Sequence, residues 1–305
     1  MSGKKSSKPG PPGPKGQIKK PSQVLLESFT KSNLISWHRH SQVSSEYEVR
    51  RYFYLAGQRA LRQAEISSAI RGGSGVPYSF DGWARVIDFK YSLESLSSVG
   101  STKSIGGRFN YGEGIDSTLF TPFPALYLAE DNETAMQERF GISKSGDFTA
   151  SEFALREEAS FSCVKVRGSL ADIFDLTDPE SVKEFIKAIS KISVTREMYR
   201  LAKAAKSNAP IIISSVDTLL KSLMDEDWRA VVMLFDLPAN SQIFGKIVKD
   251  CGCEGILYQS VKGKGNCLAV FPDSLQHSSS YIEIADSAPP GSINRLDSSS
   301  WDKLV

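Results

Sequence analysis

The chain has 305 residues, enough for one large domain with an accessory segment or for two modest domains. With 40% hydrophobic and 24% charged residues, it has the composition of an ordinary soluble globular protein. No apolar run approaches the roughly 18 residues that cross a bilayer, and no signal-peptide core follows the lysine-rich start, so we expect a cytoplasmic protein that does not enter membranes.

The net charge of +2 is distributed unevenly along the chain. Residues 1–20 contain six lysines and no acid, so this segment carries +6 and the rest of the chain about −4. The segment is also rich in proline and glycine and cannot bury enough apolar surface to fold, so we predict a disordered basic tail. Such a tail is either a solubilising arm or a contact for nucleic acid or a partner.

Residues 21–78 are predicted to form a helical N-terminal segment. Ser45-x-x-Glu48 has the spacing of a capping box, and the sequence that follows places apolar side chains among basic and polar ones. Interleaved glutamates argue against direct binding of nucleic acid, which favours packing on the main domain or on a partner protein. The glycines from Gly72 to Gly75 indicate the boundary to the next unit.

The main domain is predicted to span residues 79–286 and to begin with the alternating strand Trp83–Ile87. Arg108 follows two glycines, in a loop whose backbone can approach a ligand closely. Tyr127 lies in a short apolar run, introduced by prolines, that predicts a strand. Glu138 falls in the second turn of a predicted helix.

That helix can be capped by Asp131 or Asn132. A loop, a strand and a helix therefore offer a cation, a ring and a carboxylate within 31 consecutive residues, which suits a small anionic substrate. Each residue also has an ordinary interpretation, as a solvated cation, a core ring or a surface charge.

A helical excursion is predicted for residues 179–226, after a strand at residues 162–166. Asp178 and Pro179 supply an N-cap and a proline at the first helical position, and residues 195–226 have a helical pattern as well. This excursion either covers a pocket or builds an interface.

The last part of the main domain is predicted to be a hairpin of strands at residues 256–258 and 268–271. Ser260 comes directly after the first of these strands. A serine there can bind a phosphate, orient a carboxylate or satisfy a turn. Residues 287–305 are expected to form a C-terminal tail.

Several motifs are missing from the sequence. There is no phosphate-binding G-x-x-x-x-G-K-[ST] loop, no G-x-G-x-x-G between a strand and a helix, and no G-x-S-x-G elbow. These absences argue against an ATPase, a hydride-transferring Rossmann enzyme and a serine hydrolase. The four cysteines lack the spacing of a disulfide framework, and the pair His38-x-His40 has no cysteine partner nearby, so no metal site is predicted.

Four separated blocks of the sequence are similar, in order, to blocks of the RES domain family, which is named for an Arg, a Glu and a Ser. The blocks are GGRFN, ALYLAEDNETAMQE, FDLTDPESV and GCEGILYQSVKGKGNCLAVFPDSL. The resemblance covers roughly residues 80–286. It implies an α+β fold, with a mixed central sheet of ADP-ribosyltransferase-like type and flanking helices, to which the helical N-terminal segment predicted above is added.

The resemblance also implies a substrate and a reaction. RES proteins are known as the toxin half of bacterial toxin–antitoxin pairs and as consumers of NAD. They release nicotinamide and pass the ADP-ribosyl group to phosphate, water or a protein. The family pattern assigns Glu138, with Arg108 and Ser260, to catalysis and requires no metal. It places Arg85, Arg108 and Ser260 at the NAD-binding site. We add Tyr127, whose ring can stack on nicotinamide or ribose, and Asn266 as a looser candidate.

These residue types suit that chemistry. A fixed carboxylate stabilises the oxocarbenium-like transition state that forms when the nicotinamide–ribose bond breaks, and a guanidinium forks onto the oxygens of a pyrophosphate. The resemblance implies an Xre-like antitoxin with a helix-turn-helix part as partner, and inorganic phosphate as a co-substrate. Open alternatives are transfer of ADP-ribose to a protein, a catalytically silent binding module and a homo-oligomer.

Overall fold

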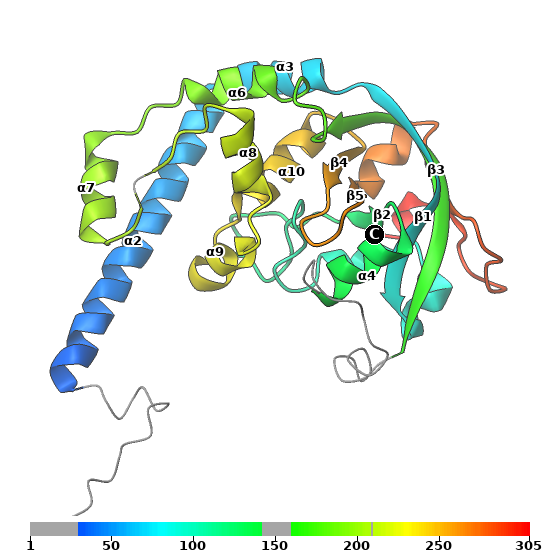
Figure 1. Cartoon of the computed structure of the whole chain (residues 1–305), viewed down its shortest axis with the longest axis horizontal. Coiled ribbons are helices and arrows are strands. Elements are labelled where there is room, and N and C mark those ends of the chain that lie inside the picture. Colours follow the sequence, from blue (N-terminus) through cyan, green and yellow to red (C-terminus); the bar gives the residue numbers. More distant parts are fainter. Residues whose placement is uncertain (1–29, 142–159, 209) are drawn as a thin grey trace, which may run out of the picture.

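A computed structural model describes residues 30–141, 160–208 and 210–305 (Figure 1). Within these ranges the fold is α+β, with seven strands in one mixed sheet and helices flanking it. The predicted basic tail, residues 1–20, lies outside the described residues.

The strands are ordered β1-β2-β5-β4-β3-β6-β7, and β1 also pairs with β3. Their bounds are β1 Val76–Asp88, β2 Leu126–Ala129, β3 Phe161–Asp175, β4 Gly255–Gln259, β5 Asn266–Val270, β6 Tyr281–Ile284 and β7 Arg295–Leu296. Among the strands of the described residues, β3 and β4 pair in parallel and the other pairs are antiparallel. Because β1 pairs with both β2 and β3, the five strands β1, β2, β5, β4 and β3 close into a ring.

The helices precede, interrupt and follow these strands. Their bounds are α2 Lys31–Leu61, α3 Gln63–Gly73, α4 Asn132–Phe140, α6 Lys183–Ser190, α7 Arg196–Ala204, α8 Val216–Leu223, α9 Trp228–Phe235 and α10 Asn240–Asp250. Short 3₁₀ helices are η1 Phe89–Glu94, η2 Val99–Ser101, η3 Pro272–His277 and η4 Trp301–Lys303. None of the helices in the described ranges is both long enough and apolar enough to span a bilayer.

Two hydrophobic cores lie on opposite faces of the sheet, as the alternation of side chains in β4 requires. Ile256 and Tyr258 pack into the core that the helices share with the sheet, whereas Leu257 packs into the core on the other face. The first core includes Phe174 of β3 and Phe244 of α10, whose rings meet edge to face at 5.5 Å.

The predicted capping box at Ser45 and Glu48 is wrong, because both residues lie inside α2. The N-cap of α2 is Thr30, whose side chain accepts a hydrogen bond from the Asn33 amide. Once nucleated, a helix lengthens by one hydrogen bond per residue, so a local cap signal does not stop it. The start of α2 projects beyond the body of the molecule, and its residues there are exposed (Figure 1).

The helical excursion differs in detail from its prediction. The helix expected at Asp178 begins only at Lys183 as α6, because the Asp178 side chain accepts from the Glu180 amide and forms a separate turn. In the following helices, α7 packs on α2, where the Tyr47 hydroxyl donates to the Asn208 carbonyl (3.2 Å). The excursion therefore fastens the N-terminal helix to the domain.

Residues 287–305 are not the tail that was expected. Strand β7 pairs with β6 through Ile282 and Leu296, and Leu296 and Leu304 are fully buried in the core on the second face of the sheet. The scarcity of apolar residues in this stretch concealed the two side chains that anchor it.

Candidate active site

A cavity of about 220 Å³ opens between the sheet, α4 and the loop that precedes β2. The residues that line it include four of the sequence candidates, Arg85, Arg108, Tyr127 and Glu138. The turn after β4 and strand β5, where the candidates Ser260 and Asn266 lie, also contribute lining residues. Helix α9, together with Glu226 shortly before it, contributes as well, and the sequence analysis did not connect this helix with the site. The structure thus brings most of the predicted side chains to one place.

Glu138 is held by the turn that follows β4. The Ser260 hydroxyl donates to Oε1 of Glu138 (2.6 Å), and the backbone amides of Val261 and Lys262 donate to the same oxygen (3.1 and 3.4 Å). Oε2 has no hydrogen-bond partner within the described part of the chain. One carboxylate oxygen is therefore fixed, and the other is left for a ligand.

Helix α4 positions the Glu138 carboxylate, because both ends of the helix are fixed. The Asp131 side chain accepts from the Thr134 amide (2.7 Å), and Gly141 ends the helix in the left-handed conformation (φ 73°). Asp131, one of the two predicted caps, is the N-cap. Glu138 then lies in the second turn, as predicted.

Ser260 is buried (6% exposed) and does not line the cavity. Its hydroxyl oxygen accepts from the amides of Lys262 and Gly263 (3.2 and 2.7 Å) while its proton goes to Glu138. A side chain at Gly263 would meet Thr134 and Gln137 of α4 at less than 3 Å, so the turn lies flat on that helix. Of the functions considered for Ser260, the structure has it orienting a carboxylate.

Tyr127 of β2 presents its ring to the cavity and uses its hydroxyl elsewhere. The hydroxyl donates to Oδ1 of Asn110 (2.8 Å) and accepts from the Phe109 amide (2.9 Å). Burial raises the pKa of Tyr127. A Cβ at Gly107 would lie 2.4 Å from this hydroxyl, so the loop can approach the ring only with glycine there. Tyr127 thus offers a ring to the cavity, while its hydroxyl proton is already donated to Asn110.

The Arg108 side chain is held by backbone carbonyls at the end of α8 and in the loop that follows it. Its Nη1 donates to the carbonyls of Leu223 and Asp225 (both 2.9 Å), and its guanidinium lies 5.8 Å from the Trp228 ring. Burial lowers the pKa of Arg108, while the nearby Tyr258 and Glu138 act in the opposite direction. The anchor leaves Nη2 and Nε for an anion.

Arg85 of β1 is bound more completely by the protein. Its Nη1 and Nη2 donate to the carbonyls of Ser95 and Ser97 (2.8 Å each), and burial lowers its pKa to about 10. The group is still charged at neutral pH. Arg85 therefore lends positive charge to the cavity wall, with both of its terminal nitrogens engaged by the protein.

Asn266 does not line the cavity. Its backbone amide donates to Oε2 of Glu130 (2.8 Å), and the next residue, Cys267, is the one that faces the cavity. Alternate residues of a strand face opposite sides, so Cys267 and Asn266 cannot both do so. The structure therefore brings Cys267, and not Asn266, to the cavity wall.

Sequence reasoning missed several lining residues: some lie next to a named candidate in the sequence, and those of the α9 region come from a distant segment. They are Arg139, Glu226, Trp228, Arg229, Tyr258, Lys262 and Cys267. Arg229 lies on α9 with its guanidinium 4.5 Å from the Trp228 ring, and no ion pair joins it to another described residue. In the sequence, the adjacent pair Trp228 and Arg229 was the one sign that α9 could contribute to a site. The types of these two residues do not indicate that they lie near Arg108.

The charge balance of the cavity is positive. Five cationic side chains, Arg85, Arg108, Arg139, Arg229 and Lys262, line it together with two carboxylates, Glu138 and Glu226. Such a lining attracts an anion. Among residues 30–141, 160–208 and 210–305, no cluster of three or more histidine, cysteine, aspartate or glutamate side chains is arranged to hold a metal ion.

Comparison with known proteins gives a family. A chain in the crystal structure of the M. tuberculosis MbcT–MbcA toxin–antitoxin complex is similar, with 16% identity, a TM-score of 0.43 and coverage of 79% of this chain and 96% of that chain. No curated protein sequence matches. The family model of the RES domain matches residues 83–289, more than half of the chain. The chain therefore belongs to the RES domain family.

Proposed function

We propose that this protein degrades NAD by breaking the bond between nicotinamide and ribose. One observation carries the proposal: the carboxylate of Glu138 has Oε1 fixed by three donors and Oε2 unbonded, at the wall of a positively charged cavity. Membership of the RES family, whose NAD chemistry the sequence resemblance implies, supports it.

The carboxylate is suited to the charge that this reaction develops. As the C–N bond lengthens, nicotinamide leaves with the bonding electron pair and the ribose becomes oxocarbenium-like, so a fixed negative charge stabilises the transition state more than the ground state. Because Ser260 and two amides already orient Glu138, little reorganisation is needed when that charge appears. Water then adds to the ribose carbon, gives its proton to solvent and yields ADP-ribose. Phosphate as acceptor yields the phosphorylated sugar instead.

The rest of the cavity supports binding of a dinucleotide. At about 220 Å³ it is smaller than the roughly 300–1,000 Å³ usual for ligand pockets, so it accommodates one end of NAD. The Tyr127 ring offers a stacking face for nicotinamide. Arg108 and Arg229 offer forked donors to the pyrophosphate, and Arg85 adds charge.

The biological setting that goes with this chemistry is a growth-arresting toxin. The proposal rests on the family, and it includes an antitoxin partner of the Xre-like class that covers the cavity. A neighbouring gene for a small helix-turn-helix protein would support the pairing, and its absence would argue against it.

The test is mass spectrometry of NAD incubated with the purified protein, with and without inorganic phosphate. We expect nicotinamide release by the wild type and at least about a hundredfold less by Glu138→Gln, the order of one electrostatic contact in a transition state. ADP-ribose as co-product indicates hydrolysis, and its phosphorylated form indicates phosphorolysis. Equal release by the two proteins would remove Glu138 from the mechanism.

Absence of release under all conditions would overturn the proposal in its present form. Adding a cell extract and following transfer of labelled ADP-ribose then separates the two remaining functions. Labelled protein would indicate an ADP-ribosyltransferase. Tight NAD binding without turnover or labelling would indicate a binding module.

A further inference from the structure

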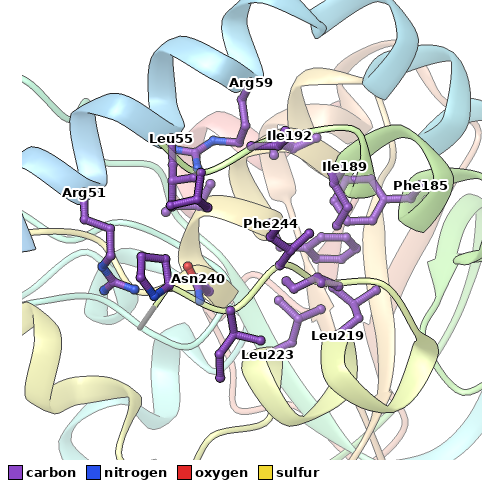
Figure 2. A pocket seen from close by; sticks show the side chains of 17 residues that line it. Arg51, Leu55, Arg59, Phe185, Ile189, Ile192, Leu219, Leu223, Asn240 and Phe244 are labelled. Atoms are coloured by element: carbon purple, nitrogen blue, oxygen red, sulfur yellow. The ribbon is translucent and has the colours of Figure 1, made fainter. Parts of the chain in front are cut away.

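A second cavity lies beneath α2, apart from the active-site cavity (Figure 2). Its volume is about 140 Å³. Its walls come from α2, α6, α8 and α10 and are mainly aliphatic and aromatic, with Leu55, Phe185, Ile189, Leu219, Leu223 and Phe244 among them. We call this cavity the apolar chamber.

A smaller cavity of about 100 Å³ adjoins it. Polar side chains contribute much of its wall, among them Glu48, Ser222, Asp225 and Asn240. We call this cavity the polar chamber. The two share wall residues, including Leu55, Arg59 and Ile243, so a ligand with an apolar end and a polar end can occupy both.

Arg59 is at this shared wall, and its guanidinium has no ion pair or hydrogen bond to any described residue. The guanidinium lies 5.9 Å from the centre of the Tyr52 ring. Burial lowers the pKa of Arg59. The neighbouring arginines are satisfied: Arg51 pairs with Glu48, and Arg62 donates to Gln58 and to the Lys191 carbonyl. A half-buried guanidinium without a partner is costly unless an anion meets it.

We propose that the two chambers bind a small amphipathic carboxylate, with its apolar group in the apolar chamber and its carboxylate on Arg59. The size of the apolar group follows from the volume, since an apolar cavity of about 150 Å³ lined by Leu, Ile and Phe takes up a molecule the size of benzene. The charge of the head group follows from the single unpaired guanidinium, whose fork matches a carboxylate. The ligand class is thus an aryl or short-chain carboxylic acid.

The chambers are joined to the active site through α8 and the loop after it. The side chain of Leu223 lines the apolar chamber, while its carbonyl accepts from Arg108. Asp225 lines the polar chamber, and its carbonyl accepts from the same Arg108 nitrogen. Trp228 lines both the polar chamber and the active-site cavity. A ligand that fixes Leu223 and Asp225 therefore fixes Arg108 and strengthens binding of NAD.

The binding test uses the full chain without NAD and isothermal titration with phenylacetate as probe. Phenylacetamide, the uncharged analogue, and Arg59→Gln should each weaken binding by at least about tenfold, as expected for loss of a charge-assisted hydrogen bond. Ile189→Phe fills the apolar chamber and should abolish binding. The matched control is Arg39→Gln, an exposed arginine of the same helix that lines neither chamber and should bind as the wild type does.

No binding of phenylacetate or hexanoate to the wild type at millimolar concentration would overturn the proposal. So would equal binding by Arg59→Gln, because the carboxylate would then lie elsewhere. Ile189→Phe that binds normally would exclude the apolar chamber. Circular dichroism confirms that each variant is folded before its result is used.

Coupling to the active site rests on the proposed function and is tested separately. Glu138→Gln leaves NAD intact, and saturating phenylacetate should tighten its NAD binding by about fivefold or more, with the reciprocal effect of NAD on phenylacetate. Both effects should vanish in the double variant with Arg59→Gln. An affinity for NAD that does not change with phenylacetate would overturn the coupling. Failure of NAD to bind would count against the proposed function and leave the result on the two chambers intact.

Discussion

Two carboxylates, the buried Glu254 and the half-buried Glu138, lie at opposite ends of β4. Glu254 precedes the strand and accepts from the Ala171 and Asp172 amides and from the Ser280 hydroxyl. Glu138 reaches the turn that follows the strand and also accepts from two amides and a serine hydroxyl. The two groups have the same kinds of donor.

The two carboxylates differ in whether one of their oxygens is left without a hydrogen bond. Glu254 is 3% exposed and has both oxygens bonded, while Glu138 has one oxygen unbonded at the wall of a cavity. The donor set alone therefore does not mark a functional carboxylate. The open second oxygen, next to cations, is what separates a group suited to chemistry from one that holds strands together.

Exchanging each carboxylate for its amide should separate the two roles most strongly. Glu138→Gln should reduce turnover of NAD by at least about a hundredfold, with the melting temperature nearly unchanged. Glu254→Gln should lower the free energy of unfolding by about 1–3 kcal/mol, because a buried donor loses its charged acceptor. Turnover per folded molecule should stay normal in that second variant. Urea unfolding and single-turnover kinetics on both variants check this.

The comparison would fail if the pattern were reversed, with Glu254→Gln inactive although folded. It would also fail if Glu138→Gln unfolded as readily as Glu254→Gln, because Glu138 would then be a structural group.

The two serines extend the same contrast with a smaller effect. Ser260→Ala removes one donor from Glu138 and should lower kcat roughly tenfold while KM for NAD changes little. Ser260→Thr keeps a hydroxyl and should recover part of the loss. Ser280→Ala should alter stability and leave kcat unchanged. A change of KM alone in Ser260→Ala would place the serine in substrate binding and not in the orientation of Glu138.

Glu138 interacts electrostatically with Arg108, an arginine of the same cavity. Changing Arg108 therefore tests the cationic surroundings that distinguish Glu138 from a structural carboxylate. Arg108→Lys keeps the charge and loses the fork, so KM for NAD should rise about tenfold. The matched control is Arg167→Lys on the exposed face of β3, where KM should not move. Unchanged KM in Arg108→Lys would place Arg108 outside the binding site.

A third carboxylate, Glu283, has arginine donors at the surface and should show the smallest effect. Arg167 and Arg295 donate to its two oxygens (2.7 Å each), and chiefly the hydrogen bond from Arg167 lowers its pKa below 4.5. A lowered pKa stabilises the folded state at pH above 4.5, and this contribution is lost as pH falls through the folded-state value.

Glu283→Gln should therefore cost less than about 1 kcal/mol in urea unfolding near neutral pH, because water screens exposed ion pairs. The difference from wild type should disappear in acid. A difference that persists at about pH 3 would mean that packing, not charge, is responsible.

The local part of this fold could be predicted from sequence, because its signals are local. Asp131 and Gly141 mark the ends of α4, and Ser260 follows a strand that two glycines introduce. Residue type alone left Arg108 and Tyr127 open to ordinary structural interpretations. It was the resemblance to RES proteins that grouped them with Glu138.

The remaining part of the site depends on long-range packing. Arg229 and Trp228 reach the cavity because the carbonyls of Leu223 and Asp225 bind Arg108 across it, and no periodicity encodes that contact. Leu304 is another example. It lies in a polar stretch that looked like a tail, yet it is fully buried.

The position of Leu304 has a consequence for proteolysis. Its carbonyl accepts from both the amide and the hydroxyl of Ser98, and Ser98 lies between Ser97, which binds Arg85, and Ser101, which accepts from Asn110. Cleavage of the chain before Leu304 would free Ser98 and loosen the segment on which Arg85 and the Arg108 loop both rest. A protein cleaved there would keep every side chain that lines the cavity and still have a weakened cavity wall.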